Sequence, residues 1–215
     1  MAGVPLALFM GPMCSGKTKA LLRAVAAARA ATRAVTLVKH AIDVRSGPRT
    51  VASRAGLALQ ADVVVPCLDA LSDIHLAAGS ILAVDEAQFF GGGLLRLYAR
   101  ARAARLGGLL VAGLDLDYRN EPFGAVLQLA QLAGGGSPPA ATTIHRLTAR
   151  CGCGSCAAPA PYTQRLLPPS GAAGAAATAL DGVVLVGGAE SYAPACASHH
   201  RPLPLAAADW AAQCP

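Results

Sequence analysis

Aromatic and charged side chains are both scarce in this chain. Of its 215 residues, 4% are aromatic and 14% are charged. Proteins that bind single-stranded nucleic acid stack successive bases on aromatic side chains, and this sequence offers few such rings. The composition therefore argues against a large base-stacking surface. A hydrophobic core must be built mainly from Leu, Val and Ala.

Long apolar segments and a cysteine framework are also lacking. Arg, Asp or Gly interrupts the longest apolar runs before they reach the length of a membrane span. The first predicted strand begins near Val4, which leaves no room for a cleaved leader peptide. Seven cysteines are an odd number, which favours thiols or metal ligands in a reducing compartment over a set of disulfides. These features predict a cytoplasmic protein with no membrane partner.

What the sequence does contain begins with a glycine loop near the N-terminus. An apolar run over 4–10 is followed by the motif G-x-x-x-x-G-K-[ST] and then by an Ala- and Leu-rich helical stretch. This order predicts phosphate binding, because the backbone N–H groups of the loop and the helix N-terminus face the phosphates. Lys17 would contact the β- and γ-phosphates of ATP, and the Thr18 hydroxyl would bind Mg²⁺. The predicted nucleotide-binding loop consists of Gly11, Pro12, Met13, Cys14, Ser15, Gly16, Lys17 and Thr18.

Positive charge gathers around this loop. The net charge of the chain is +6, and residues 1–54 contain nine of the 18 Lys and Arg residues with a single acid, Asp43. A basic segment attracts polyanions, which can be nucleic acid or a nucleotide. Its position around a phosphate-binding loop favours the nucleotide.

An acidic pair ends a second apolar run. Residues 81–84 are Ile-Leu-Ala-Val, and Asp85 and Glu86 follow them. A carboxylate at the end of such a strand, downstream of a P-loop, is typical of the Walker B element that holds Mg²⁺. Asp85 is therefore the predicted Mg²⁺ residue. Glu86 is the predicted general base for an attacking hydroxyl group or water.

Residues 113–124 follow another predicted strand and combine acids with the rings of Tyr118 and Phe123. Ligands of open α/β sheets bind at the C-terminal ends of the strands, so these rings suit a planar substrate. Taken alone, the segment also fits an ordinary polar loop.

Cysteine and histidine recur at metal-ligand spacing in the C-terminal third. One C-x₂-C pair and one C-x₂-H pair lie at the tips of predicted hairpins. Together they supply four ligands for a tetrahedral structural Zn²⁺ with no open position for catalysis. Cys151 and His200 are alternatives that leave the exact ligand set open. The four predicted ligands are Cys153, Cys156, Cys196 and His199.

The order of the elements predicts an α/β fold, with a P-loop NTPase-type parallel sheet flanked by helices. After Ala133 a Gly- and Pro-rich break precedes the cysteines, which predicts a small zinc-binding, β-rich domain. We predict domains at 1–140 and 141–201 and a flexible tail at 202–215. The predicted strands lie near 4–10, 35–39, 61–66, 80–85 and 108–114, and the predicted helices near 17–31, 69–77, 91–105 and 123–133.

The motifs, and their order along the chain, resemble those of the type II thymidine kinases, the cellular-type cytosolic family. The resemblance includes the P-loop, Asp-Glu-Ala-Gln-Phe-Phe at 85–90, Gly-Leu-Asp-x-Asp-Tyr-Arg at 113–119 and Gly-Gly-Ala-Glu-x-Tyr at 187–192. It implies transfer of the ATP γ-phosphoryl group to the 5′-hydroxyl of thymidine or deoxyuridine in pyrimidine salvage. It further implies a homotetramer, and a structural zinc that anchors a lasso loop over about 157–188.

The same resemblance implies roles for individual residues. Glu86 would accept the proton of the 5′-hydroxyl, and Asp43 and Arg45 would lie near the reacting phosphates. Gln88 is assigned to the nucleotide site. Backbone groups of the lasso would bind the edge of the pyrimidine. The implied thymidine site consists of Met13, Phe89, Tyr118, Phe123, Thr163, Val184, Gly187, Gly188 and Tyr192.

Two other functions stay open. A P-loop kinase of another small substrate would leave the zinc pairs and the aromatic cluster unexplained. A zinc-ribbon P-loop ATPase that binds nucleic acid would use the positive charge, but that charge lies around the P-loop and not near the cysteines. Cys14, Arg54 and Leu116 stand where the family usually has other residues, and their effect on affinity is left open.

Overall fold

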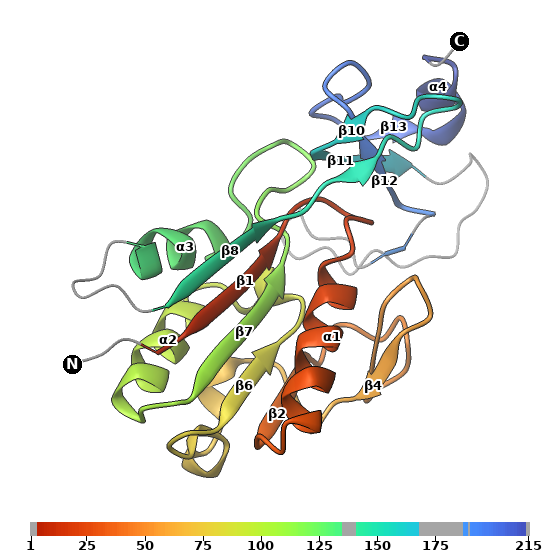
Figure 1. Ribbon diagram of the computed structural model, residues 1–215. Helices are drawn as coiled ribbons and strands as arrows, with labels where there is room; N and C mark the ends of the chain where they lie inside the picture. Colours follow the sequence, from red (N-terminus) through yellow and green to blue (C-terminus); the bar gives the residue numbers. More distant parts are fainter. Residues whose placement is uncertain (1–3, 135–140, 168–186, 189, 214–215) are drawn as a thin grey trace. The chain divides into compact units, whose positions relative to one another are not determined.

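The computed structural model describes residues 4–134, 141–167, 187–188 and 190–213 (Figure 1). The chain divides into two compact units. None of the described helices combines the length and apolar character that a membrane crossing requires. Unit 1 comprises Met1–Met10, Gly16–Asp115 and Pro122–Arg146, and unit 2 comprises Gly11–Ser15, Leu116–Glu121 and Leu147–Pro215.

A six-stranded parallel sheet forms the centre of unit 1. Its strands are β1 (Leu6–Met10), β2 (Val35–His40), β5 (Val63–Val65), β6 (Ile81–Val84), β7 (Gly108–Gly113) and β8 (Thr142–Arg146). The strand order is β5-β2-β6-β7-β1-β8, and every neighbouring pair is parallel. Strand β6 is buried along its whole length, as expected for a parallel sheet covered on both faces. The predicted P-loop NTPase-type α/β fold is thus confirmed.

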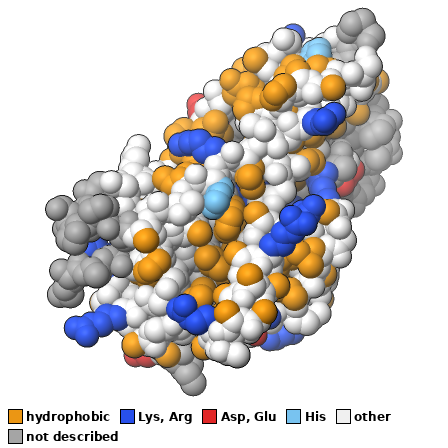
Figure 2. Space-filling model, viewed as in Figure 1, with side chains coloured by type: hydrophobic (Ala, Val, Ile, Leu, Met, Phe, Trp, Pro, Cys, Tyr) orange, Lys and Arg blue, Asp and Glu red, His pale blue; other side chains and the backbone are white. Residues whose placement is uncertain are grey.

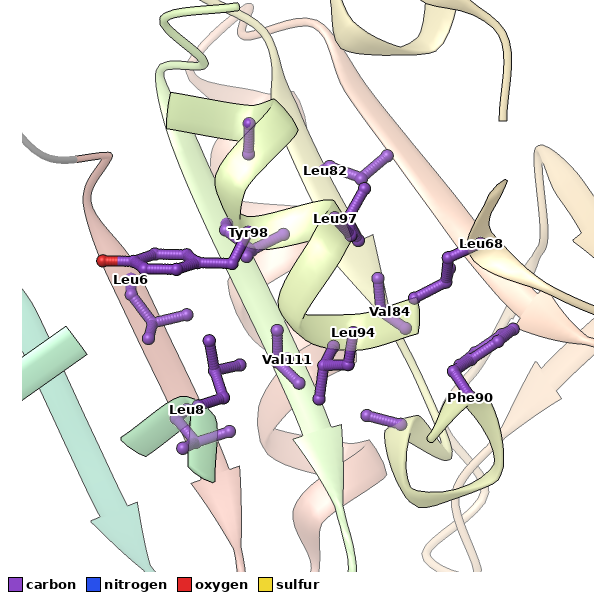
Figure 3. Close-up of a cluster of buried hydrophobic side chains, with 14 of the residues drawn as sticks. Leu6, Leu8, Leu68, Leu82, Val84, Phe90, Leu94, Leu97, Tyr98 and Val111 are labelled. Atoms are coloured by element: carbon purple, nitrogen blue, oxygen red, sulfur yellow. The ribbon is translucent and has the colours of Figure 1, made fainter. Parts of the chain in front are cut away.

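Helices cover both faces of this sheet. Helix α1 (Lys17–Ala30) lies on one face, and α2 (Gly93–Ala103) and α3 (Val126–Gly134) lie on the other (Figure 1). Helix α2 forms because its apolar residues recur at helical spacing and make one continuous buried stripe. Figure 3 shows two of them, Leu94 and Leu97, beside the buried strand residues Leu82, Val84 and Val111.

The sheet also determines where polar residues gather. Strands β2, β6 and β7 run parallel, so the loops that follow them leave the same edge of the sheet. These loops begin at Ala41, Asp85 and Leu114. Residues that are far apart in the sequence therefore meet at one edge of unit 1.

Two connections differ from the prediction. The segment predicted as a helix at 69–77 forms two 3₁₀ turns, η1 (Leu68–Ala70) and η2 (Asp73–Leu76). Among the side chains of 69–77 whose burial is described, Leu71 and Leu76 are the buried apolar ones, and a separation of five residues is not helical spacing. An unpredicted hairpin of β3 (Thr50–Ala52) and β4 (Ala58–Gln60) follows β2.

Strand β8 places the end of unit 1 later than the predicted boundary at residue 140. It pairs in parallel with β1, with Ile144 opposite Leu8, and unit 1 extends to Arg146. The Gly- and Pro-rich break at 134–139 marks a connection inside unit 1. A break in composition does not reveal whether the following strand returns to the same sheet.

Unit 2 is small and rich in β-structure. Its elements are β9 (Ala149–Arg150), β10 (Pro159–Ala160), β11 (Tyr162–Leu167), β12 (Tyr192–Ala195), β13 (Leu205–Ala206) and α4 (Ala207–Ala211). Its core contains Cys151, Cys153, Cys196 and Trp210. Because Trp210 is buried, part of the predicted tail at 202–215 belongs to the folded unit. Residues 168–186, most of the predicted lasso, lie outside the described residues.

Candidate functional site

The second half of the P-loop begins helix α1 in unit 1. Gly16 has a φ of 89° and precedes the helix, so Lys17 and Thr18 occupy its first turn. The first backbone N–H groups of an α-helix lack partners within the helix, and the helix dipole places partial positive charge there. This turn is therefore suited to bind phosphate.

The first half of the loop packs within unit 2. A side chain on Gly11 would collide with the carbonyl oxygen of Leu147, so glycine is required there. The N–H of Met13 donates to the Thr163 hydroxyl over 3.0 Å, which places one predicted thymidine-site residue against the loop. Cys14 has a φ of 63°, a backbone conformation that is uncommon for residues other than glycine.

Asp85 and Thr18 form the candidate magnesium site in unit 1. Asp85 follows β6 and is 4% exposed, and the Thr18 hydroxyl lies 3.2 and 3.3 Å from its two carboxylate oxygens. Burial, together with the nearby charge of Glu86, raises the pKa of Asp85 to about 7. A bound cation would stabilise this carboxylate, and carboxylate and hydroxyl oxygens are ligands that Mg²⁺ prefers. The two side chains therefore fit the predicted ion.

Glu86 is held through both of its carboxylate oxygens. One oxygen accepts a hydrogen bond from the guanidinium of Arg45, and the other accepts from Nε2 of Gln88 over 2.5 Å. Glu86 also has a φ of 51°, and such unusual backbone conformations are concentrated at functional sites. Each ionised oxygen keeps a further lone pair, so this carboxylate can still accept a proton from a substrate hydroxyl.

Gln88 contacts the candidate base and lies in the buried interior. Its Oε1 accepts the N–H of Leu114 over 2.9 Å, and 3% of the residue is exposed. Because Oε1 must face this N–H donor, the NH₂ group of the amide must face Glu86. The sequence analysis assigned Gln88 to the nucleotide site, whereas its observed contacts orient the carboxylate of Glu86.

The loop after β2 provides the cation beside Glu86. Asp43 accepts hydrogen bonds from Nε of Arg45 over 2.7 Å and from its backbone N–H over 3.3 Å. Burial opposes the charge on both side chains, but their ion pairs outweigh it. The pKa of Asp43 is consequently lowered and the pKa of Arg45 is raised, the latter chiefly by the charge of Glu86. Both groups are ionised at neutral pH, and Arg45 lies beside the candidate base Glu86.

Two of the predicted thymidine-site rings meet in unit 1. Phe89 and Phe123 lie edge to face, with ring centroids 6.1 Å apart. Next to them in the sequence, Gly124 approaches the backbone of Gln88 too closely for any side chain. Such a pair presents apolar surface that suits a planar base.

Tyr118 lies in a more enclosed environment than a stacking ring needs. In unit 2 the guanidinium carbons of Arg119 and Arg165 each lie 5.2 Å from its ring centroid, and the residue is 5% exposed. Nε2 of His200 lies 2.9 Å from the Tyr118 carbonyl oxygen, and the His200 ring stacks on Tyr162. In this arrangement Tyr118 and His200 contribute to the packing of unit 2.

The remaining predicted thymidine-site residues lie in or next to the lasso segment. The N–H of Tyr192 donates to the carbonyl oxygen of Gly188 over 3.1 Å. Gly187 is buried. Val184 lies outside the described residues, so its contact with a pyrimidine stays a prediction.

Three of the four predicted zinc ligands come together in unit 2. Cys156, Cys196 and His199 form a cluster with Cys151, and their candidate ligand atoms all lie within 4.8 Å of one another. Nδ1 of His199 lies 3.5 Å from Sγ of Cys151 and 3.3 Å from Sγ of Cys196. Three thiols and one imidazole suit tetrahedral Zn²⁺, and the set leaves no open position.

Cys153 lies outside this cluster. Its side chain is buried and disulfide-bonded, contrary to the expectation of free thiols or metal ligands, and its Sγ lies 3.4 Å from the carbonyl oxygen of Trp210. The fourth position is taken by Cys151, an alternative that the sequence left open. The left-handed turn at Gly154, with a φ of 50°, separates Cys153 from Cys156. The geometry thus favours a C-x₄-C pair over the predicted C-x₂-C pair.

In this cluster, the local structure favours the thiolate form of Cys196. Burial disfavours charge on Cys196, but hydrogen bonds from the backbone N–H groups of His199 and Ser198 outweigh it, and the pKa of Cys196 is lowered. A thiolate is the form in which cysteine binds metal. Backbone geometry of the C-x₂-H turn therefore supports the proposed metal binding.

A family model and two related proteins all indicate the same family. Residues 4–200 match the family model described as "Thymidine kinase". The chain is 36% identical over 208 residues to a thymidine kinase of Deinococcus deserti, covering 93% of this chain and 95% of the relative. It is 37% identical over 210 residues to a thymidine kinase of Deinococcus radiodurans, covering 93% and 91%.

Proposed function

This chain belongs to the thymidine kinase family, and on that premise we propose that it transfers the γ-phosphoryl group of ATP to the 5′-hydroxyl of thymidine or deoxyuridine. The observation that supports this reaction most directly is the arrangement around Glu86. A carboxylate held by Arg45 and Gln88, next to the buried Asp85, provides a proton acceptor beside a fixed cation. A phosphoryl transfer to a hydroxyl group needs both.

In the proposed reaction, Glu86 accepts the proton of the 5′-hydroxyl while the 5′-oxygen forms a bond to the γ-phosphorus. The bond between that phosphorus and the bridging oxygen breaks, and ADP leaves. Arg45 has five N–H donors, of which Asp43 and Glu86 use only some. The others can donate to phosphoryl oxygens, while Lys17 contacts the β- and γ-phosphates.

Thr18 and Asp85 would hold Mg²⁺, which when bound neutralises negative charge on the phosphates. Their oxygens lie within 3.3 Å of one another at the start of α1 and the end of β6. Neither position depends on a loop that must close, since one side chain follows a strand and the other begins a helix.

As the family resemblance implies, the thymine base would lie among Met13, Phe89, Tyr118, Phe123 and Tyr192, with backbone groups of the lasso along its edge. Thymine and uracil share the O4 acceptor and the N3–H donor, whereas cytosine reverses both. Buried backbone groups left unpaired by the wrong base can discriminate by ~10⁴-fold. We therefore expect thymidine and deoxyuridine to be accepted and deoxycytidine to be refused. Loss of the 5-methyl group should cost only about 1 kcal/mol.

A coupled assay of ATP consumption over a panel of nucleosides tests the proposal. Turnover with thymidine and deoxyuridine only is the expected result. Equal kcat/KM for deoxycytidine and thymidine would contradict the account of the base site while leaving the kinase assignment intact. No turnover with any pyrimidine nucleoside would contradict the function itself.

In unit 2 we propose a structural Zn²⁺ on Cys151, Cys156, Cys196 and His199 that anchors the lasso. This proposal is supported by the ligand geometry. Elemental analysis should find one zinc per chain.

The proposal also includes a homotetramer in the cytoplasm, without nucleic acid or membrane partners. Reduced cysteines of the kind that bind zinc persist in a reducing compartment. Figure 2 shows one face, on which individual Lys and Arg side chains stand among apolar and uncharged groups. Light scattering on a sizing column and a salt-dependent gel shift with DNA test these two points.

A further inference from the structure

Lys39 is a buried charged residue to which the motifs of the sequence assign no role. It lies near the end of β2, and 2% of it is exposed. The chain contains only three lysines, Lys17, Lys19 and Lys39. Lysine is seldom fully buried unless it has a partner, because removing an ammonium group from water is costly.

The ammonium of Lys39 contacts both ends of the loop that follows β2. Its Nζ donates to the carbonyl oxygen of Thr50, in β3, over 2.7 Å. It also pairs with Oδ2 of Asp43 over 3.4 Å. The loop between these contacts is open to solvent, since Val44 is 67% exposed. Lys39 therefore ties an exposed loop to the interior of the sheet.

Asp43 uses its two oxygens for different partners. Oδ2 faces Lys39, and Oδ1 accepts hydrogen bonds from Nε and the backbone N–H of Arg45. This division restrains the rotation of the carboxylate. The other end of the Arg45 guanidinium meets Glu86. An unbroken series of charged contacts thus runs from the buried ammonium to the candidate base.

We infer that Lys39 is a positioning residue for phosphoryl transfer. By fixing the carboxylate of Asp43, it presents Arg45 to Glu86 and to the reacting phosphate. The inference rests on the proposed function, and it extends that function to a residue that touches neither substrate. Lysine serves here because its compact ammonium group can reach both acceptors, the Thr50 carbonyl oxygen and Oδ2 of Asp43, where a planar guanidinium would need more space.

A double-mutant cycle tests this role in catalysis. Lys39→Met keeps the aliphatic stem and removes the charge, and Asp43→Asn removes the charge of its partner. Each change should lower kcat by ~10- to 100-fold with KM for thymidine altered less than ~2-fold, because ground-state binding is not affected. Both changes act on Arg45 through one contact, so the double variant should be no slower than the slower single variant. Lys19→Met, in α1 and outside these contacts, is the matched control and should keep the wild-type kcat.

Other outcomes would overturn the inference. Losses that multiply in the double variant, or a higher KM with unchanged kcat, would make Lys39 a residue that only stabilises the loop. Lys39→Gln provides a second variant should Lys39→Met fail to fold, because its amide can still donate to the carbonyl oxygen of Thr50 but carries no charge.

A second measurement needs no catalysis. In protein labelled with ¹⁵N-arginine, the Nε–H of Arg45, identified by its absence from Arg45→Lys, should exchange slowly with water. Lys39→Met should accelerate that exchange by ~10-fold or more, as expected when a protecting hydrogen bond is lost. The Nε–H of Arg96, which bonds to Asp69 over 3.0 Å, is the control in the same spectrum. Unchanged exchange at Arg45 in the folded variant would refute the inference. A wild-type protein that fails to phosphorylate thymidine would refute the proposed function instead.

Discussion

The two units hold their functional side chains by different means. In unit 1, Asp85, Glu86 and Arg45 lie in the loops that follow parallel strands, and the sheet packs on a core rich in Leu and Val side chains. In unit 2, three of the strands have two residues each, and the core includes Cys151, Cys196 and Trp210. A site on a large sheet keeps its scaffold when a polar residue is changed. A small unit whose core contains the candidate metal ligands is expected to depend on a bound metal for its fold.

The largest effect should follow from a change to the base in unit 1. Glu86→Gln keeps the shape of the side chain but removes the proton acceptor, so kcat should fall by ~10²- to 10⁴-fold. The melting temperature should change little, because the sheet beneath is intact. Glu121→Gln, an exposed residue of unit 2, is the matched control. Turnover of thymidine by Glu86→Gln at the wild-type rate would end the assignment of Glu86 as base.

A change to the candidate metal ligands in unit 2 should affect stability and KM more than it affects kcat. Cys151→Ser and Cys196→Ser should each release zinc, lower the melting temperature of unit 2 and raise KM for thymidine by ~10-fold or more, with ATP binding less affected. Cys153→Ser should retain one zinc per chain, because Cys153 lies outside the cluster. Elemental analysis of the three proteins decides between the two ligand sets. Loss of zinc from Cys153→Ser with full zinc in Cys151→Ser would restore the ligand set predicted from the sequence.

A smaller loss should come from the residue that orients the base. Gln88→Met matches the length of the side chain but removes both hydrogen bonds, so Glu86 loses one partner and the N–H of Leu114 is left unpaired. We expect kcat to fall ~10-fold and stability to fall by ~1–3 kcal/mol. The KM for ATP should be unchanged, whereas a nucleotide-binding role would raise it. Gln128→Met, on the exposed side of α3, is the control.

The last prediction concerns stability and not turnover: the stability of unit 1 should depend on pH. The pKa of Asp85 is raised from 3.8 to about 7, chiefly by burial, so the folded protein keeps a proton that the unfolded chain has lost. Without Mg²⁺, this group's contribution to stability is therefore full below pH 3.8 and falls as the pH rises toward 7, by at most about 1.4 kcal/mol per pH unit. The test is thermal unfolding of the wild type against Asp85→Asn, in which this slope should be absent.

Two further observations sharpen the pH experiment. Burial lowers the pKa of His40, which contributes a slope of the opposite sign to both proteins, so only their difference reports on Asp85. Added Mg²⁺ should stabilise the wild type more at pH 8 than at pH 5, because it binds the ionised carboxylate. Equal stabilisation at both pH values would argue against Asp85 as the magnesium ligand.

The sequence predicted the structure correctly wherever the motif or apolar pattern lies within one continuous segment. The P-loop, the apolar run that ends at Asp85 and the helical stripe of α2 all appear where they were predicted. The choice between Cys151 and Cys153 could not be made in this way, because a C-x-C-x₂-C sequence offers two ligand pairs. The choice depends on which cysteine the packing of unit 2 directs toward Trp210.

The sequence by itself determined the chemistry of this protein: a P-loop, a pair of carboxylates, a set of thiol and imidazole ligands, and the order that identifies the thymidine kinase family. Only the tertiary structure decided which partners these groups have. Arg45, Glu86 and Leu114 follow three different strands, and the contacts of Arg45 with Glu86 and of Gln88 with the Leu114 N–H exist because parallel strands end at one edge of the sheet. The pairing of β8 with β1 was decided in the same way. Motifs are local because they reflect the covalent order of a few residues, whereas the pairing of distant side chains is set by sheet register and packing, which no single segment contains.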